Sequence, residues 1–465
     1  MNAARRPAGA LRVPTRREIR DVARLATPIV GVQVGLMLMG TVDAAMVGRV
    51  SARDLAAAAL GNFWWMTVAL FGAGVVMAID PVVSQALGAN DDEAVALGVQ
   101  RGVVLAVIMT VFSSLMLLPT EWVLRGLGQP SDVVPLAAKY VLIQIPSALP
   151  FFLFVAFRQT LQALHQVRPV LLAVVVANVA NVALNWIFIY GRWGVPPLGV
   201  VGSSISTTIG RYLMLAILAV LAWRSLGGSI RPWRTDTLRW APISRMLGIG
   251  VSIGVHQFFE IVAFGGALVI VGLLGTTPLA GHEIAISLAA LTYMVPLGVN
   301  AAAAVLVGRA IGRGDLDGAR REASAALACG VGFMAVAATV LLTIPDGLAR
   351  LFSTDPEVIA IAVTLIPLAG LFQMFDGVQG VSSGILRGAG DTRVPMMINL
   401  MGYVAIGLPL GAWLCLRAGY GARGMWWGLV VALASVAVAL SWRVHTHLGG
   451  ELARLSLDRT APPHR

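Results

Sequence analysis

Twelve long apolar runs divide this chain and limit what it can fold into. Each run is at least as long as the roughly 20 residues that a helix needs to cross the hydrocarbon layer of a bilayer. The chain is 57% hydrophobic and 12% charged, with a mean hydropathy of +0.81, whereas soluble globular domains contain roughly 25% charged residues. We therefore expect an all-α integral membrane protein with twelve transmembrane helices. The predicted spans are residues 22–48, 55–81, 98–119, 133–157, 168–190, 199–223, 246–273, 279–307, 322–346, 358–384, 394–416 and 423–445.

The Lys and Arg residues between the runs predict the orientation. Twelve spans place both termini on one side, and 25 of the 34 Lys and Arg residues fall on that side, 8 on the other and Arg211 within a span. Positively charged loops stay in the cytoplasm, so we expect a multi-pass protein of the bacterial cytoplasmic membrane with both termini cytoplasmic. This topology explains the net charge of +11, and without a basic soluble domain no nucleic-acid partner is expected.

The two halves of the chain repeat each other at an offset near 224. LGANDDEA parallels IGRGDLDG, which pairs Gly88 with Gly312 and Asp91 with Asp315, and VGRVSARDLAA and LQALHQVR have counterparts in VGLLGTTPLAG and LRGAGDTR. Six spans separate equivalent positions, so the second half enters the membrane in the same orientation as the first. We expect two pseudo-symmetric six-helix bundles around a central cavity, an arrangement typical of secondary transporters.

This repeat predicts five parts of the chain. They are a cytoplasmic N-terminal segment (1–21), an N-lobe of six spans (22–223), a basic cytoplasmic linker (224–245), a C-lobe of six spans (246–445) and a cytoplasmic tail (446–465). The linker is rich in Arg and contains two prolines, which favours a hinge between the lobes.

Few charged side chains lie at membrane depth, where each costs roughly 2.5 to 3.5 kcal/mol to insert and is a functional candidate. Glu260 and Asp376 lie well inside the seventh and tenth predicted spans, with no basic residue within a helical turn. A low dielectric disfavours the charged form of a carboxylate, so such a group can take up a proton. Two converging carboxylates with other oxygen atoms can instead hold a sodium ion. The alternative is that these acids are protonated and only join neighbouring helices by hydrogen bonds.

The predicted N-lobe has its own polar candidates. Asp43 in the first span could accept a proton, or could instead meet Arg49 or water. Asn178, Asn181 and Asn185 are spaced three and four apart and so share one face of a helix. They could line a polar cavity or form a hydrogen-bonded seam between helices.

Three further ionisable residues lie near the ends of predicted spans. Asp80 precedes Pro81 at the end of the second span, where we expect a solvated helix end. His282 and Glu283 begin the eighth span and are expected at the membrane interface. The HEIAI sequence at His282 lacks the second histidine of a HExxH zinc site.

Absent motifs narrow the mechanism. The only lysine is Lys139, so the chain has no Walker A sequence and cannot be the ATPase of a primary pump, which leaves ion gradients as the energy source. Cys329 and Cys415 both fall in predicted spans, so no disulfide framework or paired-cysteine metal site is expected. We therefore expect no enzymatic activity and no cofactor beyond a coupling ion.

Four stretches occur in an order found in a known family. They are TVDAAMVGRVSARDLAAAALGN from Thr41, VHQFFEIVAFGGALVIVGLLGTTPLAGHEIA from Val255, YMVPLGVNAAAAVLVGRAIGRGD from Tyr293 and QMFDGVQGVSSGILRGAGDTRVP from Gln373. In this order the chain resembles the multidrug and toxic compound extrusion family, and within it the NorM-like branch. The resemblance covers nearly the whole chain. It implies two six-helix lobes that form a V-shaped cavity and export organic, often cationic, compounds in exchange for sodium ions or protons.

The resemblance also implies site residues. In NorM-like members the acids of the seventh and tenth helices belong to the cation site, and these correspond to Glu260 and Asp376. The acid of the first helix, here Asp43, lies in the polar cavity of the other lobe. Relatives that couple protons through the first lobe carry an acid where this chain has Asn185. That departure gives weight to the second-lobe site.

We therefore expect a monomeric secondary antiporter whose partners are small organic cations, sodium ions or protons, and the lipid bilayer. One alternative is a lipid-linked precursor flippase of the same superfamily. A flippase usually has a cationic cavity for pyrophosphate, whereas the deep candidate charges here are acidic. A membrane-embedded enzyme is the other alternative, and the incomplete zinc motif at His282 gives it little support.

Overall fold

The chain is helical throughout the part that the structure describes. The computed structural model describes residues 11–450 and 452–457, and these residues contain helices and turns but no strand. Within these ranges, twelve helical segments are long and apolar enough to cross a membrane. The predicted all-α class with twelve spans is confirmed.

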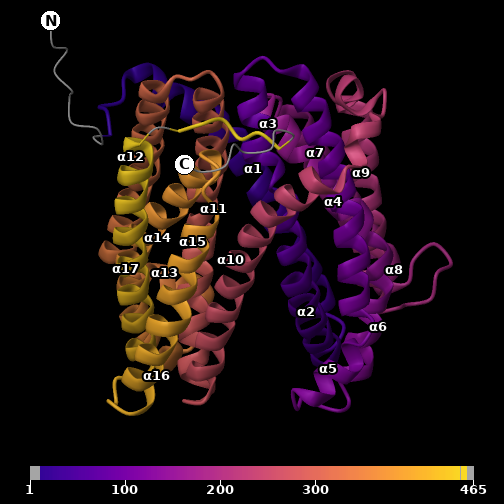
Figure 1. Ribbon diagram of the computed structural model, residues 1–465. Helices are drawn as coiled ribbons and strands as arrows, with labels where there is room; N and C mark the ends of the chain where they lie inside the picture. Colours follow the sequence, from indigo (N-terminus) through magenta and orange to yellow (C-terminus); the bar gives the residue numbers. More distant parts are fainter. Residues whose placement is uncertain (1–10, 451, 458–465) are drawn as a thin grey trace, which may run out of the picture. The chain divides into compact units, whose positions relative to one another are not determined.

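Most spans are single helices, and three are interrupted (Figure 1). The first six spans are α1 (Arg16–Val47), α2 (Ala52–Val76) with α3 (Ile79–Gly88), α4 (Asp92–Leu117), α6 (Val134–Gln144) with α7 (Ala148–Ala163), α8 (Arg168–Tyr190) and α9 (Val200–Ile230). The last six are α10 (Trp240–Gly272), α11 (Thr276–Gly312), α12 (Leu316–Thr343), α14 (Pro356–Gly388), α15 (Arg393–Leu400) with α16 (Leu408–Leu416), and α17 (Gly421–Gly449). The interruptions are η1 (Ile145–Ser147) between α6 and α7, the π-helix η3 (Met401–Gly407) between α15 and α16, and a turn between α2 and α3. The short helices α5 (Thr120–Gly126) and α13 (Pro345–Phe352) connect spans.

Both neighbouring helices extend into the predicted linker, residues 224–245. Helix α9 ends at Ile230 and α10 begins at Trp240, and the turn η2 (Thr235–Leu238) lies between them. The side chain of Gln100 on α4 binds this connection through several hydrogen bonds. Its Nε2 donates to the carbonyl of Pro232 at 3.0 Å, and its Oε1 accepts from the backbone N–H of Arg234 at 3.0 Å. The connection is therefore fastened to α4.

Contacts divide the chain into two compact units. Of the described residues, unit 1 holds the segment up to Val30, Ser84–Asn90 and Val255–Leu455. Unit 2 holds Gly31–Val83, Asp91–Gly254 and the segment from Ser456. Helices α1, α3 and α10 each contribute residues to both units.

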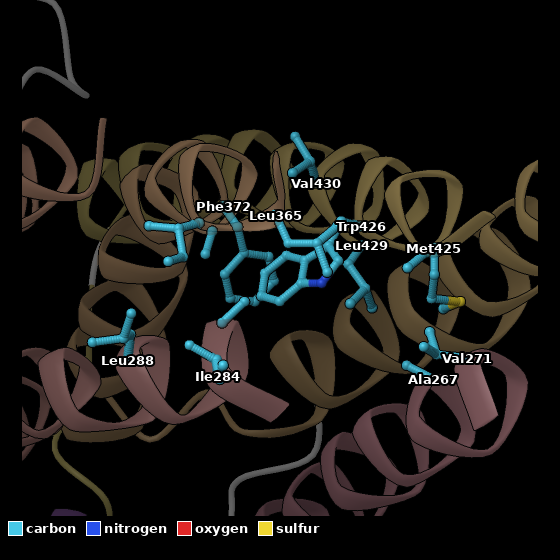
Figure 2. Close-up of a cluster of buried hydrophobic side chains, with 14 of the residues drawn as sticks. Ala267, Val271, Ile284, Leu288, Leu365, Phe372, Met425, Trp426, Leu429 and Val430 are labelled. Carbon is cyan, nitrogen blue, oxygen red and sulfur yellow. The ribbon is translucent and has the colours of Figure 1, made fainter. Parts of the chain in front are cut away.

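The core of unit 1 is built around Trp426 of α17. Its ring meets that of Phe372 on α14 edge-on, with centroids 5.8 Å apart and an interplanar angle of 85°, a favourable aromatic arrangement. Ala267 of α10 and Leu288 of α11 belong to the same cluster (Figure 2). Helix α14 packs against α11, α12 and α17 and so is the central helix of this unit.

The core of unit 2 is built around Trp65 of α2. Its ring meets Phe151 of α7 edge-on at 5.2 Å, and Tyr140 of α6 and Ile189 of α8 belong to the same cluster. Trp65 is 1% exposed, so it faces the interior of the unit.

Two glycines of α14 bring it into backbone contact with α11. A Cβ at Gly384 would lie 2.3 Å from the carbonyl oxygen of Asn300, and one at Gly388 would lie 2.4 Å from that of Ala304. These distances leave no room for a side chain, and the neighbouring atoms belong to a backbone. Small residues permit such close helix packing in membranes. Helix α14 is thereby fixed to α11 two to three turns after Asp376.

The repeat-related Gly88 and Gly312 also form close contacts, in a reciprocal manner. A Cβ at Gly88 would lie 2.1 Å from the carbonyl oxygen of Arg309, and one at Gly312 would lie 2.1 Å from that of Gln85. Helices α3 and α11 therefore meet through both glycines within unit 1. The pairing seen in the sequence corresponds to equivalent packing positions.

The repeat-related Asp91 and Asp315 both cap helices. Asp91 accepts a hydrogen bond from the backbone N–H of Ala94 at 3.0 Å, and Asp315 accepts one from Gly318 at 2.7 Å. Each satisfies one of the free N–H groups at the start of a helix, α4 or α12.

Removal of one cap gives a measurable loss of stability. We expect Asp315→Ala to destabilise the protein by about 1 kcal/mol, because the Gly318 N–H loses its acceptor. Asp315→Asn keeps an accepting oxygen and serves as the control. The measurement is the melting temperature of the purified protein, followed by intrinsic fluorescence. An identical melting temperature for Asp315→Ala and the wild type would contradict the assignment.

Candidate functional site

Asp376 lies on the central helix of unit 1, where it is 5% exposed. One turn later, Gly380 leaves space for Tyr293 of α11. A Cβ at Gly380 would lie 3.3 Å from the Tyr293 hydroxyl. Because residues four apart share a helix face, the absence of a side chain at Gly380 places a phenol hydroxyl close to the Asp376 carboxylate. The glycine-rich sequence around Asp376 thus gives the acid a polar neighbour.

Glu260 of α10 lies within electrostatic range of Asp376. Its side chain is 22% exposed, and one turn earlier the Nε2 atom of His256 lies 4.0 Å from its Oε2 atom. No Lys or Arg within the described ranges forms an ion pair with either acid. The structure therefore brings together the two acids predicted for this site, and they have no paired cation there.

Two glutamines of α14, Gln373 and Gln379, flank Asp376 in the sequence and bind side chains of neighbouring helices. Gln379 Nε2 lies 3.4 Å from His256 Nε2 and donates to Asn399 Oδ1 at 2.8 Å. Gln373 Nε2 donates to the Thr292 hydroxyl. These bonds fix the orientation of both glutamines, whose Oε1 atoms are buried without a hydrogen-bond partner, as is the hydroxyl of Tyr403.

The donor set of this site suits a hard cation. Glu260 and Asp376 lie within electrostatic range of the Tyr403 hydroxyl, which is buried without a hydrogen-bond partner among the described residues, and buried polar atoms are normally satisfied. Hard cations such as sodium favour carboxylate, carbonyl and hydroxyl oxygens. The described residues contain no cluster of three or more His, Cys, Asp or Glu side chains that could hold a metal ion. A cation here would therefore use the two acids and neutral oxygens.

Unit 2 contains a second buried acid, Asp43 of α1, which is 9% exposed. Its Oδ1 accepts a hydrogen bond from Asn185 Nδ2 at 2.5 Å, and the hydroxyl of Thr207 lies 2.9 Å from its Oδ2. Asn185 Nδ2 also lies 3.2 Å from Asn181 Oδ1. Asp43 is thus bound by side chains of α8 and α9.

The three asparagines of α8 do not act together. Asn181 and Asn185 belong to the polar cluster around Asp43. Asn178 instead donates to the backbone carbonyl of Gly35 on α1 at 3.0 Å and to that of Val174 at 2.9 Å. Asn178 therefore joins α8 to α1 by a hydrogen bond. This corresponds to the second of the two alternatives given for the asparagines, a hydrogen-bonded seam between helices.

Sequence reasoning assigned no role to Thr207 or Arg211 of α9. The two residues are four apart, so they share a helix face, and Arg211 is 8% exposed. An arginine inside an apolar span is costly and is usually functional. The sequence shows that Arg211 lies within an apolar run. It does not show which residues of neighbouring helices contact Arg211.

One expectation about the ends of spans is wrong, that of a solvated Asp80. Asp80 is 1% exposed and accepts a hydrogen bond from Gln159 Nε2 at 2.9 Å, because the second span continues to Gly88 rather than ending at residue 81. His282 is 2% exposed, and its ring lies 5.8 Å from that of Trp426 in the core of unit 1. Glu283 is exposed.

An apolar groove lies on another face of α8. It has a volume of about 550 Å³ and is lined by Met46 of α1 and by Val179, Val182, Ala183 and Trp186 of α8. These four α8 residues share a face that differs from that of Asn181 and Asn185. The groove is therefore separate from the Asp43 cluster.

Known proteins are similar to this chain in sequence and in fold. The MatE family model matches residues 28–187 and 253–413, two stretches separated by the offset of the repeat. A probable multidrug resistance protein NorM of Mesorhizobium japonicum is 35% identical over 464 residues, which cover 96% of each chain. A multidrug resistance protein MdtK of Edwardsiella ictaluri is 31% identical, and the match covers 92% of this chain and 95% of the relative.

Solved structures share the fold at low sequence identity. A eukaryotic MATE transporter superposes with a TM-score of 0.85 at 20% identity, covering 93% of this chain and 97% of the other. An outward-facing multidrug resistance MATE family transporter gives a TM-score of 0.85 at 17% identity, covering 93% and 96%. The family match spans most of the chain, and the relatives match over nearly their full length. The chain therefore belongs to the MatE family, the multidrug and toxic compound extrusion proteins, and is a membrane transporter rather than an enzyme.

Proposed function

We propose that this chain is a secondary active antiporter that exports organic, mainly cationic, drugs or toxic compounds in exchange for sodium ions or protons. The names of its relatives, multidrug resistance proteins, support the cargo class. The absence of a Walker A sequence from the chain leaves an ion gradient as the energy source.

The coupling site in this proposal is the pair Glu260 and Asp376. The observation that carries it is that Asp376 is 5% exposed and the Glu260 side chain 22% exposed, within electrostatic range of each other and without a Lys or Arg ion-pair partner among the described residues. Two uncompensated carboxylates in a low dielectric repel each other and pay a large desolvation cost. A proton or a sodium ion relieves both effects, so the site has a strong tendency to take up an ion.

Coupling then follows from differential binding. An ion that enters from outside binds the acids and favours the conformation in which cargo is released outside. Cargo that enters from inside carries positive charge and competes with the ion for the same negative potential. A ligand shifts a conformational equilibrium only by its difference in affinity between the states, so the acids must be more accessible from outside in one state and from inside in the other.

In the same proposal the transporter lies in the bacterial inner membrane as a monomer, with both termini in the cytoplasm. Its two lobes alternate in access around the cargo site. The bacterial relatives and the excess of Lys and Arg on the side of the termini support this placement.

Everted membrane vesicles test the proposed function. Their interior corresponds to the outside of the cell, so a sodium or proton gradient directed out of the vesicle should drive accumulation of ethidium, a lipophilic organic cation. We expect accumulation with one of the two gradients, imposed separately, and none in vesicles that lack the protein. If neither gradient drives uptake of ethidium or of a panel of other organic cations, the antiporter proposal fails.

A further inference from the structure

The end of α9 carries an arginine stacked on a tryptophan at the surface of unit 2. The guanidinium carbon of Arg231 lies 5.4 Å from the ring centroid of Trp223. Trp223 is 51% exposed, and Arg231 is exposed as well. The indole lies against Gly227, where an added Cβ would meet it at 3.8 Å. The pair is therefore held on the outer side of the helix end, where it can contact a molecule from outside the protein.

The positive charge of Arg231 is not compensated by an acid of the described chain. Within residues 11–450 and 452–457, neither Arg231 nor Arg224 forms an ion pair. The neighbouring Arg234 differs, because its guanidinium lies 2.6 Å from the carboxylate of Glu93. A guanidinium that stacks on a ring through its face keeps its N–H edge for an anion such as a phosphate.

The same face of α9 continues as an apolar stripe. Residues spaced by three, four or seven share one face of a helix, and this face carries Ile209, Ala216, Val220, Arg224 and Gly227. Val220 is 78% exposed and Ile209 39% exposed, and Ala216 is also exposed. Ile209 and Val220 are separated by about 16 Å along the helix axis, close to half of the ~30 Å hydrocarbon layer. The stripe therefore has the length of one leaflet.

The length of α9 places the stacked pair at the level of the lipid headgroups. The helix has 31 residues from Val200 to Ile230, whereas about 20 residues cross the hydrocarbon layer. If the layer begins near Val200, it ends near Val220, and Trp223 and Arg224 lie just beyond it. Tryptophan prefers this interface, and basic residues there attract anionic headgroups.

The order of side chains along this face matches the order of groups in a phospholipid. Apolar residues up to Val220 are followed by the indole of Trp223 and then by Arg224 and Arg231. An acyl chain, a glycerol group and a phosphate would therefore meet apolar, aromatic and cationic side chains in turn.

The connection that begins at Arg231 is held in place by the protein. The Thr237 hydroxyl donates to Oε1 of the buried Gln100 at 2.6 Å, which is one of several bonds between this connection and α4. Trp233 is 47% exposed and Trp240 is 67% exposed, so further aromatic rings lie at the same end of the span. A preformed surface loses little conformational entropy when it binds a ligand.

We propose that Trp223, Arg224 and Arg231 bind the headgroup of an anionic phospholipid whose acyl chain lies along Ile209 and Val220. The occupant is a lipid because the apolar stripe belongs to a helix long and apolar enough to span a membrane, and it is anionic because both arginines lack an acid partner in the described chain. Six spans precede the connection, so the site lies in the leaflet on the side of the N-terminus. The lipid site does not depend on the proposed antiport function.

Fluorescence quenching of the full-length protein in nonionic detergent tests the proposal at the site itself. The probes are phosphatidylglycerol and phosphatidylcholine that carry the same brominated acyl chains, because bromine quenches a nearby indole. The signal of Trp223 is the difference between a protein and the same protein with Trp223→Phe. We expect phosphatidylglycerol to quench Trp223 with an affinity about fivefold higher than phosphatidylcholine. Equal affinities for the two lipids would overturn the proposal.

Variants of the two arginines leave the reporter in place. Arg231→Gln should weaken the binding of phosphatidylglycerol about fivefold, and addition of Arg224→Gln should weaken it further. Arg231→Lys keeps the charge and should retain a preference for the anionic lipid. The control is Arg125→Gln, which changes an exposed arginine of α5 that pairs with Glu121 and should bind as the wild type does. Melting temperatures report folding, and wild-type affinity in folded Arg231→Gln with Arg224→Gln would overturn the proposal.

A competition experiment separates a lipid from a soluble phosphate. Glycerol 3-phosphate has the charged group of the lipid but no acyl chain. In large excess it should leave the quenching of Trp223 by brominated phosphatidylglycerol unchanged. Displacement of the lipid by an equal concentration of glycerol 3-phosphate would show that the site takes a soluble anion, and this result would also overturn the proposal.

Discussion

Asp376→Asn is expected to abolish ion-driven accumulation of ethidium in everted vesicles while leaving the protein in the membrane at wild-type abundance. The amide has the size of the carboxylate but cannot take up a proton or supply a charge to a cation. Because the acid lies in the interior of unit 1 at 5% exposure, its neutralisation removes the ion's preferred partner in a low dielectric. Glu260→Gln should act in the same direction, and we expect uptake to fall to the background in both.

A matched control separates loss of the site from loss of any acid. Glu283 is an exposed carboxylate on α11 in the same unit, and Glu283→Gln should retain wild-type uptake. Immunoblots of the vesicles and size-exclusion elution of the purified variants report abundance and folding. Wild-type coupled transport in both Glu260→Gln and Asp376→Asn would refute the assignment of the coupling site.

Gly384→Ala is expected to destabilise unit 1 by about 2 kcal/mol or more, since overpacking costs of 1 to 3 kcal/mol are typical even where side chains can move. Here the added methyl carbon would lie 2.3 Å from the carbonyl oxygen of Asn300. The two helix backbones must separate, and the bonds of Asn300 to Gly380 and Arg387 are then disturbed. The measurement is the melting temperature of the purified protein, together with uptake in vesicles.

Gly332→Ala provides the control for a glycine within a membrane helix. Gly332 lies on α12 in the same unit, and a Cβ there meets nothing within 4 Å. Alanine is the better helix former by roughly 1 kcal/mol, so this variant should melt at the wild-type temperature or slightly above it. If Gly384→Ala and Gly332→Ala behave alike, the backbone contact between α11 and α14 does not limit stability.

The fold could be predicted from the sequence because a membrane span depends on the hydropathy averaged over many residues. The twelve apolar runs predicted the twelve spans seen in the described chain. The spacing of Asp91 and Asp315 across the repeat was informative because both cap helices. Length and composition did not reveal how far a span continues. For that reason Asp80 was expected in solvent, although it is buried.

Only part of the candidate site could be predicted from the sequence. Glu260 and Asp376 were conspicuous because a carboxylate in an apolar run is costly wherever it points. Their surroundings depend on which helices meet, and no local pattern links Gln379 to His256 or Gln373 to Thr292. The same limit hid the arrangement of Arg211 over Trp65, which joins residues far apart in the chain.

The mutual contact of Gly88 and Gly312 has a consequence for how a duplicated gene can diverge. Each of these glycines contacts the backbone of a helix that belongs to the other repeat. A larger residue at either position would therefore disturb the packing of both repeats, and neither glycine can be replaced independently of the other. The polar interiors have no such reciprocity, and they now differ, with two acids in one copy and an acid bound by Asn185 and Thr207 in the other. After the duplication, the glycine contacts between the repeats were kept, while the polar residues inside the two repeats diverged.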